Sequence, residues 1–231
     1  MRVLLKLSGE ALSSKENVFD HEYLENVAKQ VKTIIKKGNS VAIVIGGGNI
    51  CRGREFELMG FDRVQADQIG MIGTVLNCMA LANVLNNNKV KAVVMSALQV
   101  EGTKPVDVEL ARQLLDKKTV VLFGGGIGNP YFSTDTACAL RAVEINADYI
   151  MIAKNGVAGV YDKDPGKNPD AKLLKSLTYQ DMLSMNLKVM DSTAASLCRD
   201  NKIKAFVFNA NGKDNIVKAV EGKIIGTTLK A

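Results

Sequence analysis

The sequence predicts one α/β domain, folded as a three-layer α/β/α sandwich around a mainly parallel central sheet. Three observations predict this fold class. Apolar runs of strand length alternate with segments of helical periodicity along all 231 residues. The runs are rich in Val, Ile and Leu on both faces, which is typical of parallel strands that helices cover on two sides. No repeat and no long linker divides the chain, so residues 1–231 are expected to form a single domain with two lobes around a cleft.

Six apolar runs are the expected strands of this sheet. They span residues 3–7, 41–45, 92–95, 120–123, 149–153 and 205–208. Segments with apolar residues at helical spacing separate them, so right-handed crossovers are expected between parallel neighbours. With 47% hydrophobic residues the chain can bury a large core, which excludes intrinsic disorder.

The helices between these strands carry recognisable start signals. Asp20 is expected to cap the first helix, and a glycine follows the end of that helix. Pro105 is expected to open a helix through VDVELARQLLD as its first-turn proline. Further along, Thr178 with Asp181 has the pattern of a capping box, and Asp191 is the expected N-cap of STAASLCRD.

Residues 68–88, QIGMIGTVLNCMALANVLNNN, carry no charged side chain. Gly and Asn interrupt the apolar residues, so the segment falls short of an unbroken transmembrane span and no membrane partner is expected. We expect a helix that is buried on nearly every side. Its uncharged face, rich in Met and Gly, also favours a contact between subunits of an oligomer.

The cysteines and the charge pattern exclude several classes of protein. The four cysteines lie far apart without a CxxC pair and the only histidine is His21, so no protein metal site is predicted. The chain runs from Arg2 directly into a strand-like segment, and we expect buried thiols in a cytoplasmic protein. The net charge of +6 is spread without basic blocks, Trp is absent, and aromatic residues make up 5%, which argues against a nucleic-acid partner.

Three of the expected strands end in glycine-rich turns, LLKLSGEAL, VIGGGNICRG and FGGGIGNPYFSTD. In open α/β sheets ligands bind at the carboxyl ends of the strands, and glycine there lets the backbone approach a phosphate closely. Ordinary structural turns are the alternative for any one of these loops. The P-loop, Rossmann and protein-kinase patterns are all absent, so hydride transfer and P-loop hydrolysis lose support.

Phosphoryl transfer by positioning remains, because it needs cations and rigid donors but little covalent chemistry. Lys6 interrupts an apolar strand just before a glycine turn, which is unusual unless the ammonium points into a charged site. Arg52 follows the second glycine loop. Asp135 opens a helix, where it is either an N-cap or the residue that orients a lysine or Mg²⁺.

Five segments carry a resemblance to a known family: KLSGEAL, GGGNICRG, GNPYFSTDTA, GVYDKDP and LKVMD. Their order and spacing resemble those of the bacterial UMP kinases of the amino-acid kinase superfamily, over essentially the whole chain. KxSG and STD…A are shared across the superfamily, whereas GGGN with RG and the following DxxGM are particular to the UMP kinases. The resemblance implies the amino-acid kinase fold with an eight-stranded sheet, a cytoplasmic location and a homohexamer built as a trimer of dimers.

The same resemblance implies transfer of the ATP γ-phosphoryl group to UMP, with Mg²⁺ accompanying ATP. It implies four catalytic residues: Lys6, Arg52, Asp135, which organises lysines around the transferred phosphate, and Lys188, the second lysine. The implied ATP-binding residues are Lys6, Leu7, Ser8, Gly9, Gly48, Arg52, Asn155, Tyr161 and Asp164. The implied UMP-binding residues are Gly47, Asp67, Ile127, Gly128, Asn129, Pro130, Tyr131, Phe132, Ser133 and Thr134.

Within that set, Asp67 is expected to accept hydrogen bonds from the ribose hydroxyls and to open the uncharged helix. The chain departs from the family in two places. SSKENVFD follows KLSGEAL where family members regulated by GTP carry a glycine-rich Phe-Gly stretch, and residues 154–157 differ from the common KVDG form. Two alternatives stay open: a related kinase acting on a carboxylate or carbamate, and a nucleotide-sensing regulator without turnover.

Overall fold

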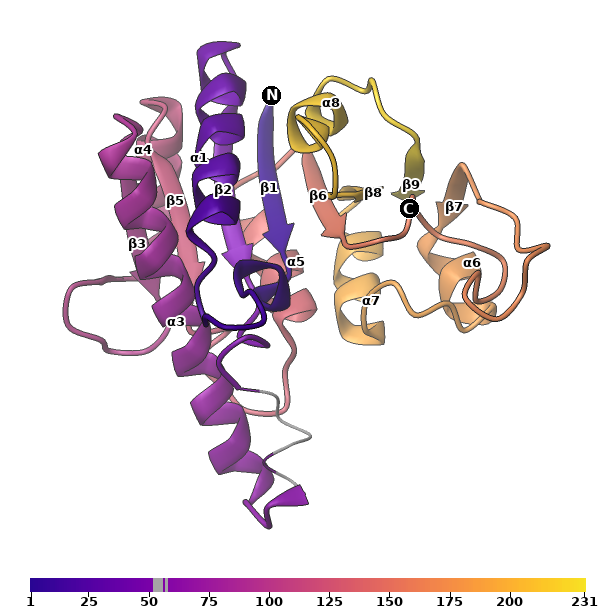
Figure 1. The fold of residues 1–231 in the computed structure, drawn as a ribbon, viewed down its shortest axis with the longest axis horizontal. Helices are drawn as coiled ribbons and strands as arrows, with labels where there is room; N and C mark the ends of the chain where they lie inside the picture. Colours follow the sequence, from indigo (N-terminus) through magenta and orange to yellow (C-terminus); the bar gives the residue numbers. More distant parts are fainter. Residues whose placement is uncertain (52–55, 57) are drawn as a thin grey trace.

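A nine-stranded sheet forms the centre of the computed structural model, which describes residues 1–51, 56 and 58–231 (Figure 1). The strand order is β4-β3-β5-β2-β1-β6-β8-β9-β7, and every pair is parallel except β8 with β9. The strands are β1 (Arg2–Leu7), β2 (Ser40–Ile45), β3 (Ala92–Ser96), β4 (Lys104–Pro105), β5 (Val120–Gly124), β6 (Tyr149–Lys154), β7 (Ser176–Thr178), β8 (Lys204–Asn209) and β9 (Gly226–Lys230). The predicted α/β fold class and all six predicted strands are therefore confirmed.

The expectation of eight strands is wrong, because the described part of the chain adds β4, β7 and β9 to the predicted six. These strands have two, three and five residues, and none carries the long apolar run that marks a buried strand. β4 also overturns the prediction for Pro105, which pairs with Ser96 at the sheet edge instead of opening a helix. Proline is tolerated there because an edge strand can do without one N–H donor.

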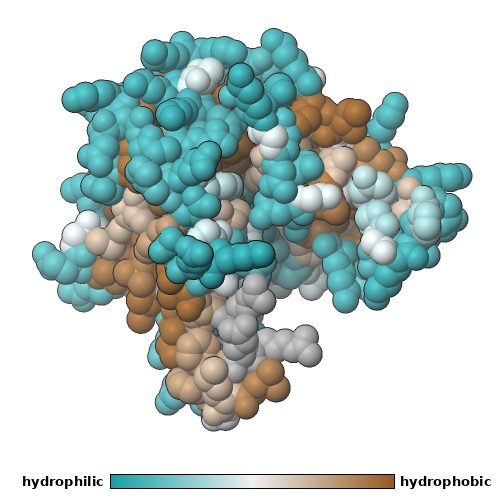
Figure 2. Space-filling model, in the orientation of Figure 1, coloured by the Kyte–Doolittle hydropathy of each residue, from teal (hydrophilic) through white to brown (hydrophobic). Residues whose placement is uncertain are grey.

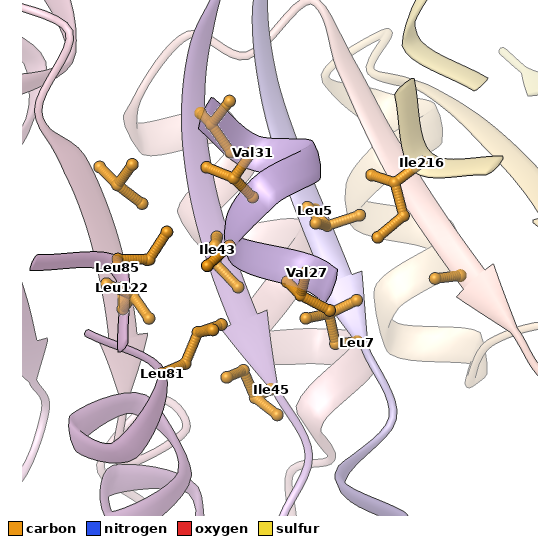
Figure 3. Packing of buried hydrophobic residues seen from close by; sticks show 14 of the residues in the cluster. Leu5, Leu7, Val27, Val31, Ile43, Ile45, Leu81, Leu85, Leu122 and Ile216 are labelled. Atoms are coloured by element: carbon orange, nitrogen blue, oxygen red, sulfur yellow. The ribbon is translucent and has the colours of Figure 1, made fainter. Parts of the chain in front are cut away.

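Helices cover both faces of the sheet, as the three-layer prediction requires. They are the 3₁₀ turn η1 (Gly9–Leu12) and the helices α1 (His21–Lys36), α3 (Arg63–Asn87), α4 (Val108–Asp116), α5 (Thr134–Glu144), α6 (Tyr179–Ser184), α7 (Ser192–Asp200) and α8 (Asn215–Val220). α1, α3 and α8 pack on one face, and α4, α5, α6 and α7 pack on the other. Figure 3 shows the first of these layers, where Leu81 and Leu85 of α3 lie close to Ile43 and Leu122 of the sheet.

Three of the predicted helix caps are confirmed. Asp20, Thr178 and Asp191 each accept a hydrogen bond from the backbone N–H three residues later. α4 instead begins after Asp107, whose carboxylate accepts from the backbone of Leu110 at 2.9 Å. The cap of α5 is Ser133, which places Asp135 at the second position of that helix. Each such cap satisfies an otherwise unpaired N–H at the start of a helix.

The uncharged segment, residues 68–88, forms most of helix α3 and is buried on one side only, so the prediction of burial on nearly every side is wrong. Its buried residues pack against the sheet, whereas Ile72 and Leu76 remain 46% and 45% exposed. Figure 2 shows hydrophobic surface over this part of the molecule. By length and composition alone, α3 could cross a membrane. However, 56% of its most apolar 18-residue stretch is buried within the protein, as in a core helix. The sheet accounts for the apolar inner side, and the apolar outer side is left uncovered.

The carboxyl ends of β1, β2, β5 and β6 meet at one edge of the sheet, because these four strands are adjacent and parallel. The three predicted glycine loops follow β1, β2 and β5 and therefore lie together. Ligands of open α/β sheets bind at such an edge, so the topology alone assembles a candidate site.

Candidate functional site

A partly buried ion pair lies at the centre of this edge. Lys6 Nζ lies 2.7 Å from Asp135 Oδ1, and the two side chains are 15% and 23% exposed. β1 carries Lys6 to the end of the sheet, while the cap at Ser133 turns the first residues of α5 toward the same point. Ser133 Oγ accepts from the backbone N–H of Asp135 and Thr136, so the Asp135 side chain is left to hold the lysine. A charge-assisted pair of this kind fixes the position of the ammonium group.

The first two glycine loops are in backbone contact. A Cβ atom placed on Gly9 would lie 2.2 Å from the carbonyl oxygen of Gly46 and 2.7 Å from the amide nitrogen of Gly48. No side chain fits in that space, so glycine at position 9 is a packing requirement rather than a matter of turn conformation. The contact lets the loops after β1 and β2 form one wall.

A cavity of about 280 Å³ opens beside this wall and contains the Lys6–Asp135 pair. Its lining residues are Lys6, Leu7, Ser8, Gly9, Glu10, Gly46, Gly47, Gly48, Ser133, Thr134 and Asp135. Five residues predicted to bind ATP are thus brought together here. Arg52, which was predicted to join them, lies outside the described residues.

A second cavity, of about 520 Å³, lies between α3, the loop that follows β5 and the start of α7. Predicted UMP-binding residues that line it are Gly47, Asp67, Tyr131, Phe132, Ser133 and Thr134. Ile127, Gly128, Asn129 and Pro130 belong to the same loop but do not line the cavity. Gly47, Ser133 and Thr134 border both this cavity and the smaller one, so the two spaces adjoin.

Asp67 fastens the loop after β5 to helix α3. One carboxylate oxygen, Oδ2, accepts from the backbone N–H of Tyr131 at 2.7 Å and from Arg63 Nε at 2.9 Å. The Arg63 guanidinium also lies over the Tyr131 ring, 5.6 Å from its centre. Tyr131 has a φ of +70°, a backbone conformation that a non-glycine residue keeps only when neighbours hold it. The expectation that Asp67 opens α3 is wrong, because Asp62 caps that helix and Asp67 follows a turn later.

Asp191 is a site residue that the sequence predicted only as a helix cap. Its carboxylate accepts a hydrogen bond from the Thr136 hydroxyl at 3.0 Å and another from the Ser133 hydroxyl. It also caps α7 and borders the 520 Å³ cavity. The link between α5 and α7 joins residues more than fifty positions apart, so no local pattern could have revealed it.

A third cavity, of about 600 Å³, lies beyond the ends of β6 and β8. Tyr161 and Asp164, which were predicted to lie at the nucleoside end of ATP, line this cavity. Lys188, which was predicted as the second catalytic lysine, lines the same cavity and not the one that contains Lys6 and Asp135. Asn155 is exposed and does not line the 600 Å³ cavity. Lys188 is also exposed, at the rim.

Lys154 is a second residue that the sequence analysis did not select. It ends β6, lines the 600 Å³ cavity and donates to the carbonyl oxygen of Val189 at 3.1 Å. Burial lowers the pKa of Lys154, and the nearby Lys6 ammonium lowers it further, while Asp135 opposes the shift. The signal was present in the sequence, because YIMIAK places a lysine at the end of an apolar strand just as RVLLKL does.

The comparison with protein families matches residues 1–209 to the amino acid kinase family. A uridylate kinase of Streptomyces avermitilis is 44% identical over 230 residues, covering 99% of this chain and 91% of the relative. One from Mycoplasmopsis pulmonis is 46% identical over 232 residues, with coverages of 99% and 96%.

Solved structures give the same result. The crystal structure of UMP kinase from Ureaplasma parvum superposes with a TM-score of 0.95 at 38% identity, covering 100% of this chain and 98% of the other. UMP kinase from Bacillus anthracis also gives 0.95, at 40% identity and coverages of 99% and 95%. A uridylate kinase from Archaeoglobus fulgidus gives 0.74 at 31% identity, with coverages of 99% and 100%.

Proposed function

Because this chain belongs to the amino acid kinase family, we propose that it is a UMP kinase, which transfers the γ-phosphoryl group of ATP to UMP and yields UDP and ADP. One observation carries the proposal: the Lys6–Asp135 pair lies in a small cavity that adjoins a larger pocket through Gly47, Ser133 and Thr134. A phosphoryl group in the small cavity would therefore lie next to an acceptor in the large one. The product UDP serves pyrimidine nucleotide biosynthesis.

The chemistry requires positioning and charge stabilisation more than proton transfer. The phosphate of UMP is already ionised at neutral pH, so no general base is needed. Holding donor and acceptor in line contributes through proximity, up to roughly 7–11 kcal/mol in the best cases. Lys6 stabilises charge on the moving phosphoryl group, and Ser133 and Thr134 at the start of α5 line both cavities.

The two nucleotides divide the site between them. ATP places its phosphates against Lys6, Leu7, Ser8, Gly9, Gly48 and Arg52, and its nucleoside extends toward Asn155, Tyr161 and Asp164, with Lys188 at the cavity rim. UMP occupies the 520 Å³ cavity, with its ribose near Asp67 and its base and phosphate against the loop of residues 127–134.

The residues of this site fit a Mg²⁺ ion that binds together with ATP, and not one that protein ligands alone coordinate. Among the described residues, no group of three His, Cys, Asp or Glu side chains is close enough to hold a metal. Asp135 and Glu10 supply carboxylates at the phosphate cavity, and Mg²⁺ is commonly held by one or two carboxylates together with substrate phosphates and water. When bound, it would neutralise charge on the ATP phosphates.

The deciding experiment is a coupled assay of ADP formation with ATP, Mg²⁺ and a panel of acceptors: UMP, CMP, carbamate and acetylglutamate. Turnover with UMP well above that with the others is expected. Preference for carbamate or acetylglutamate would identify a different kinase of the same family, and nucleotide binding without turnover would identify a regulator. Adding GTP or UTP would test regulation.

Asp67 should set the preference for ribose over deoxyribose. Its Oδ2 already accepts two hydrogen bonds within the protein, which leaves Oδ1 to accept from a ribose hydroxyl. Charge-assisted hydrogen bonds contribute roughly 1.5–3 kcal/mol, so dUMP should be a poorer acceptor than UMP by roughly tenfold or more in kcat/KM. In Asp67→Asn this gap should narrow, because a neutral amide lacks the charge assistance.

The measurement is the ratio of kcat/KM for UMP to that for dUMP in both proteins. Asp62→Asn is the matched control, since Asp62 caps the same helix one turn earlier and does not line the acceptor cavity. Equal ratios in wild type and Asp67→Asn would reduce Asp67 to a structural fastener of the loop after β5.

We also propose that the protein acts in the cytoplasm as a homohexamer, a trimer of dimers, with the exposed side of α3 in a subunit contact. The apolar stripe that includes Ile72 and Leu76 supports this, because large exposed apolar patches mark interaction surfaces. Light scattering should report an assembly well above the chain mass of 24.9 kDa.

Ile72→Lys should shift that assembly toward smaller species, because it places a charge in the apolar contact. Met79→Lys, less exposed on the same helix, should act in the same direction if Met79 also faces the contact. Gln113→Lys on the exposed face of α4 is the control and should leave the mass unchanged. A wild-type monomer at micromolar concentration would exclude the assembly, and an unchanged mass in Ile72→Lys would move the contact away from α3.

A further inference from the structure

Two lysines and one carboxylate lie together at the carboxyl ends of β1 and β6. Lys6 pairs with Ile152 in the parallel register, and Lys154 follows two residues later along β6. Because paired residues in parallel strands lie on one face of the sheet and alternate residues share that face, Lys6 and Lys154 project to the same side. This is the side on which α5 supplies Asp135.

The charges in this cluster do not balance. The Asp135 carboxylate is committed to Lys6 at 2.7 Å. Within the described residues, the polar contact of Lys154 is with the neutral carbonyl of Val189, at 3.1 Å. The two ammonium groups are close enough for Lys6 to lower the pKa of Lys154. A partly buried cation without its own anion is unfavourable, so the cluster is arranged to receive negative charge.

The position of Lys154 specifies which anion that is. Lys6 lines the small phosphate cavity, whereas Lys154 lines the 600 Å³ cavity that also contains Tyr161 and Asp164. Each of the two cavities therefore has one of the two lysines in its wall, so a molecule that occupies both would lie against both ammonium groups. ATP has that form, with a nucleoside at one end and a chain of anionic phosphates at the other.

We propose that Lys154 binds the β- and γ-phosphates of ATP directly, as a second cation beside Lys6. This assignment rests on the proposed kinase function. Lys154 would hold the phosphate chain as it passes from the nucleoside cavity toward the Lys6–Asp135 pair. Its bond to Val189 would be exchanged for, or shared with, a phosphate oxygen when ATP enters.

Binding affinities for ADP and UMP, measured by titration calorimetry, test this without depending on turnover. Lys154→Met should weaken ADP binding tenfold or more and change UMP binding less than twofold. Lys154→Arg should retain most of the ADP affinity, because it keeps the charge. Lys163→Met is the matched control: Lys163 lines the same cavity but pairs with Asp170 at 2.6 Å, and its loss should leave ADP affinity within twofold of wild type.

A purely structural role for Lys154 predicts a different pattern. Lys154→Gln retains a donor for the Val189 carbonyl while removing the charge, so a structural role predicts near-normal ADP affinity and our proposal predicts the same loss as in Lys154→Met. Wild-type ADP affinity in Lys154→Gln would overturn the proposal, as would equal losses for ADP and UMP in Lys154→Met.

The wild-type acceptor assay separates this inference from the function on which it rests. If the wild type phosphorylates UMP but Lys154→Gln binds ADP normally, only the assignment of Lys154 is wrong. If the wild type does not phosphorylate UMP, the proposed function is wrong, and the ADP titrations still decide whether Lys154 binds a nucleotide phosphate. Near-UV circular dichroism of each variant confirms that the fold is intact before titration.

Discussion

Lys6→Ala should lower kcat by a factor of roughly 10²–10³, equivalent to about 2.7–4 kcal/mol, while leaving the fold intact. The ammonium lies at the end of β1 and is held at 2.7 Å by Asp135. A donor fixed in this way stabilises charge that develops mainly in the transition state, so its loss should appear in kcat more than in the KM for UMP. Steady-state kinetics with ATP, Mg²⁺ and UMP measure both constants.

Lys91→Ala is the control for this experiment. Lys91 is exposed next to the start of β3, so this substitution removes the same charge far from the carboxyl ends of the strands. It should keep its turnover. If Lys6→Ala retained more than about a tenth of wild-type kcat, a loss below about 1.4 kcal/mol, Lys6 would not have the assigned role. Because Lys6→Ala leaves Asp135 without its ion-pair partner, the variant could also be less stable. A thermal unfolding curve distinguishes a loss of catalytic activity from a loss of folded protein.

Gly9→Ala should destabilise the protein and disrupt the phosphate cavity together. The added methyl group would lie 2.2 Å from the Gly46 carbonyl oxygen, and backbone atoms cannot move aside as a flexible side chain can. Overpacking of this kind typically costs about 1–3 kcal/mol. The loops after β1 and β2 must separate to relieve it, so kcat/KM for ATP should fall at least tenfold.

Gly46→Ala provides a control within the same pair of loops. A Cβ atom on Gly46 would meet its nearest atom, the amide nitrogen of Gly9, at 3.4 Å, an ordinary contact distance. Its midpoint of thermal unfolding should stay close to wild type, whereas that of Gly9→Ala should fall by about 2–4 °C for each kcal/mol lost. Equal midpoints in Gly9→Ala and wild type would mean that the two loops are not in contact in solution.

Local patterns predicted most of the fold because the forces that specify each element act over a few residues. A strand buried on two faces needs an apolar run, and a helix start needs a side-chain acceptor for a nearby N–H, as at Asp20 and Thr178. The errors occurred where those signals are weak or shared. β4 and β7 are too short to show a pattern, and Pro105 is compatible with both a helix start and a sheet edge.

The burial of α3 was mispredicted for a related reason. Residues 68–88 lack charged side chains on both sides of the helix. That pattern does not distinguish the side that packs on the sheet from the side on which Ile72 and Leu76 are exposed. Only the position of the helix against β3 and β5 separates the two.

The sequence by itself determined the α/β class, six strands of the sheet, the three glycine loops and the choice of Lys6 and Asp135 as reacting-site candidates. Each of these features is specified within a short segment, by apolar periodicity, by a capping side chain or by a charged residue inside an apolar strand. The tertiary structure decided what those segments form together: the backbone contact of Gly9 with Gly46 and the unbalanced charge of Lys154 beside Lys6. Interactions between residues distant in the chain depend on strand order and helix placement, which no single segment encodes, so the complete site exists only once the sheet has brought its strand ends together.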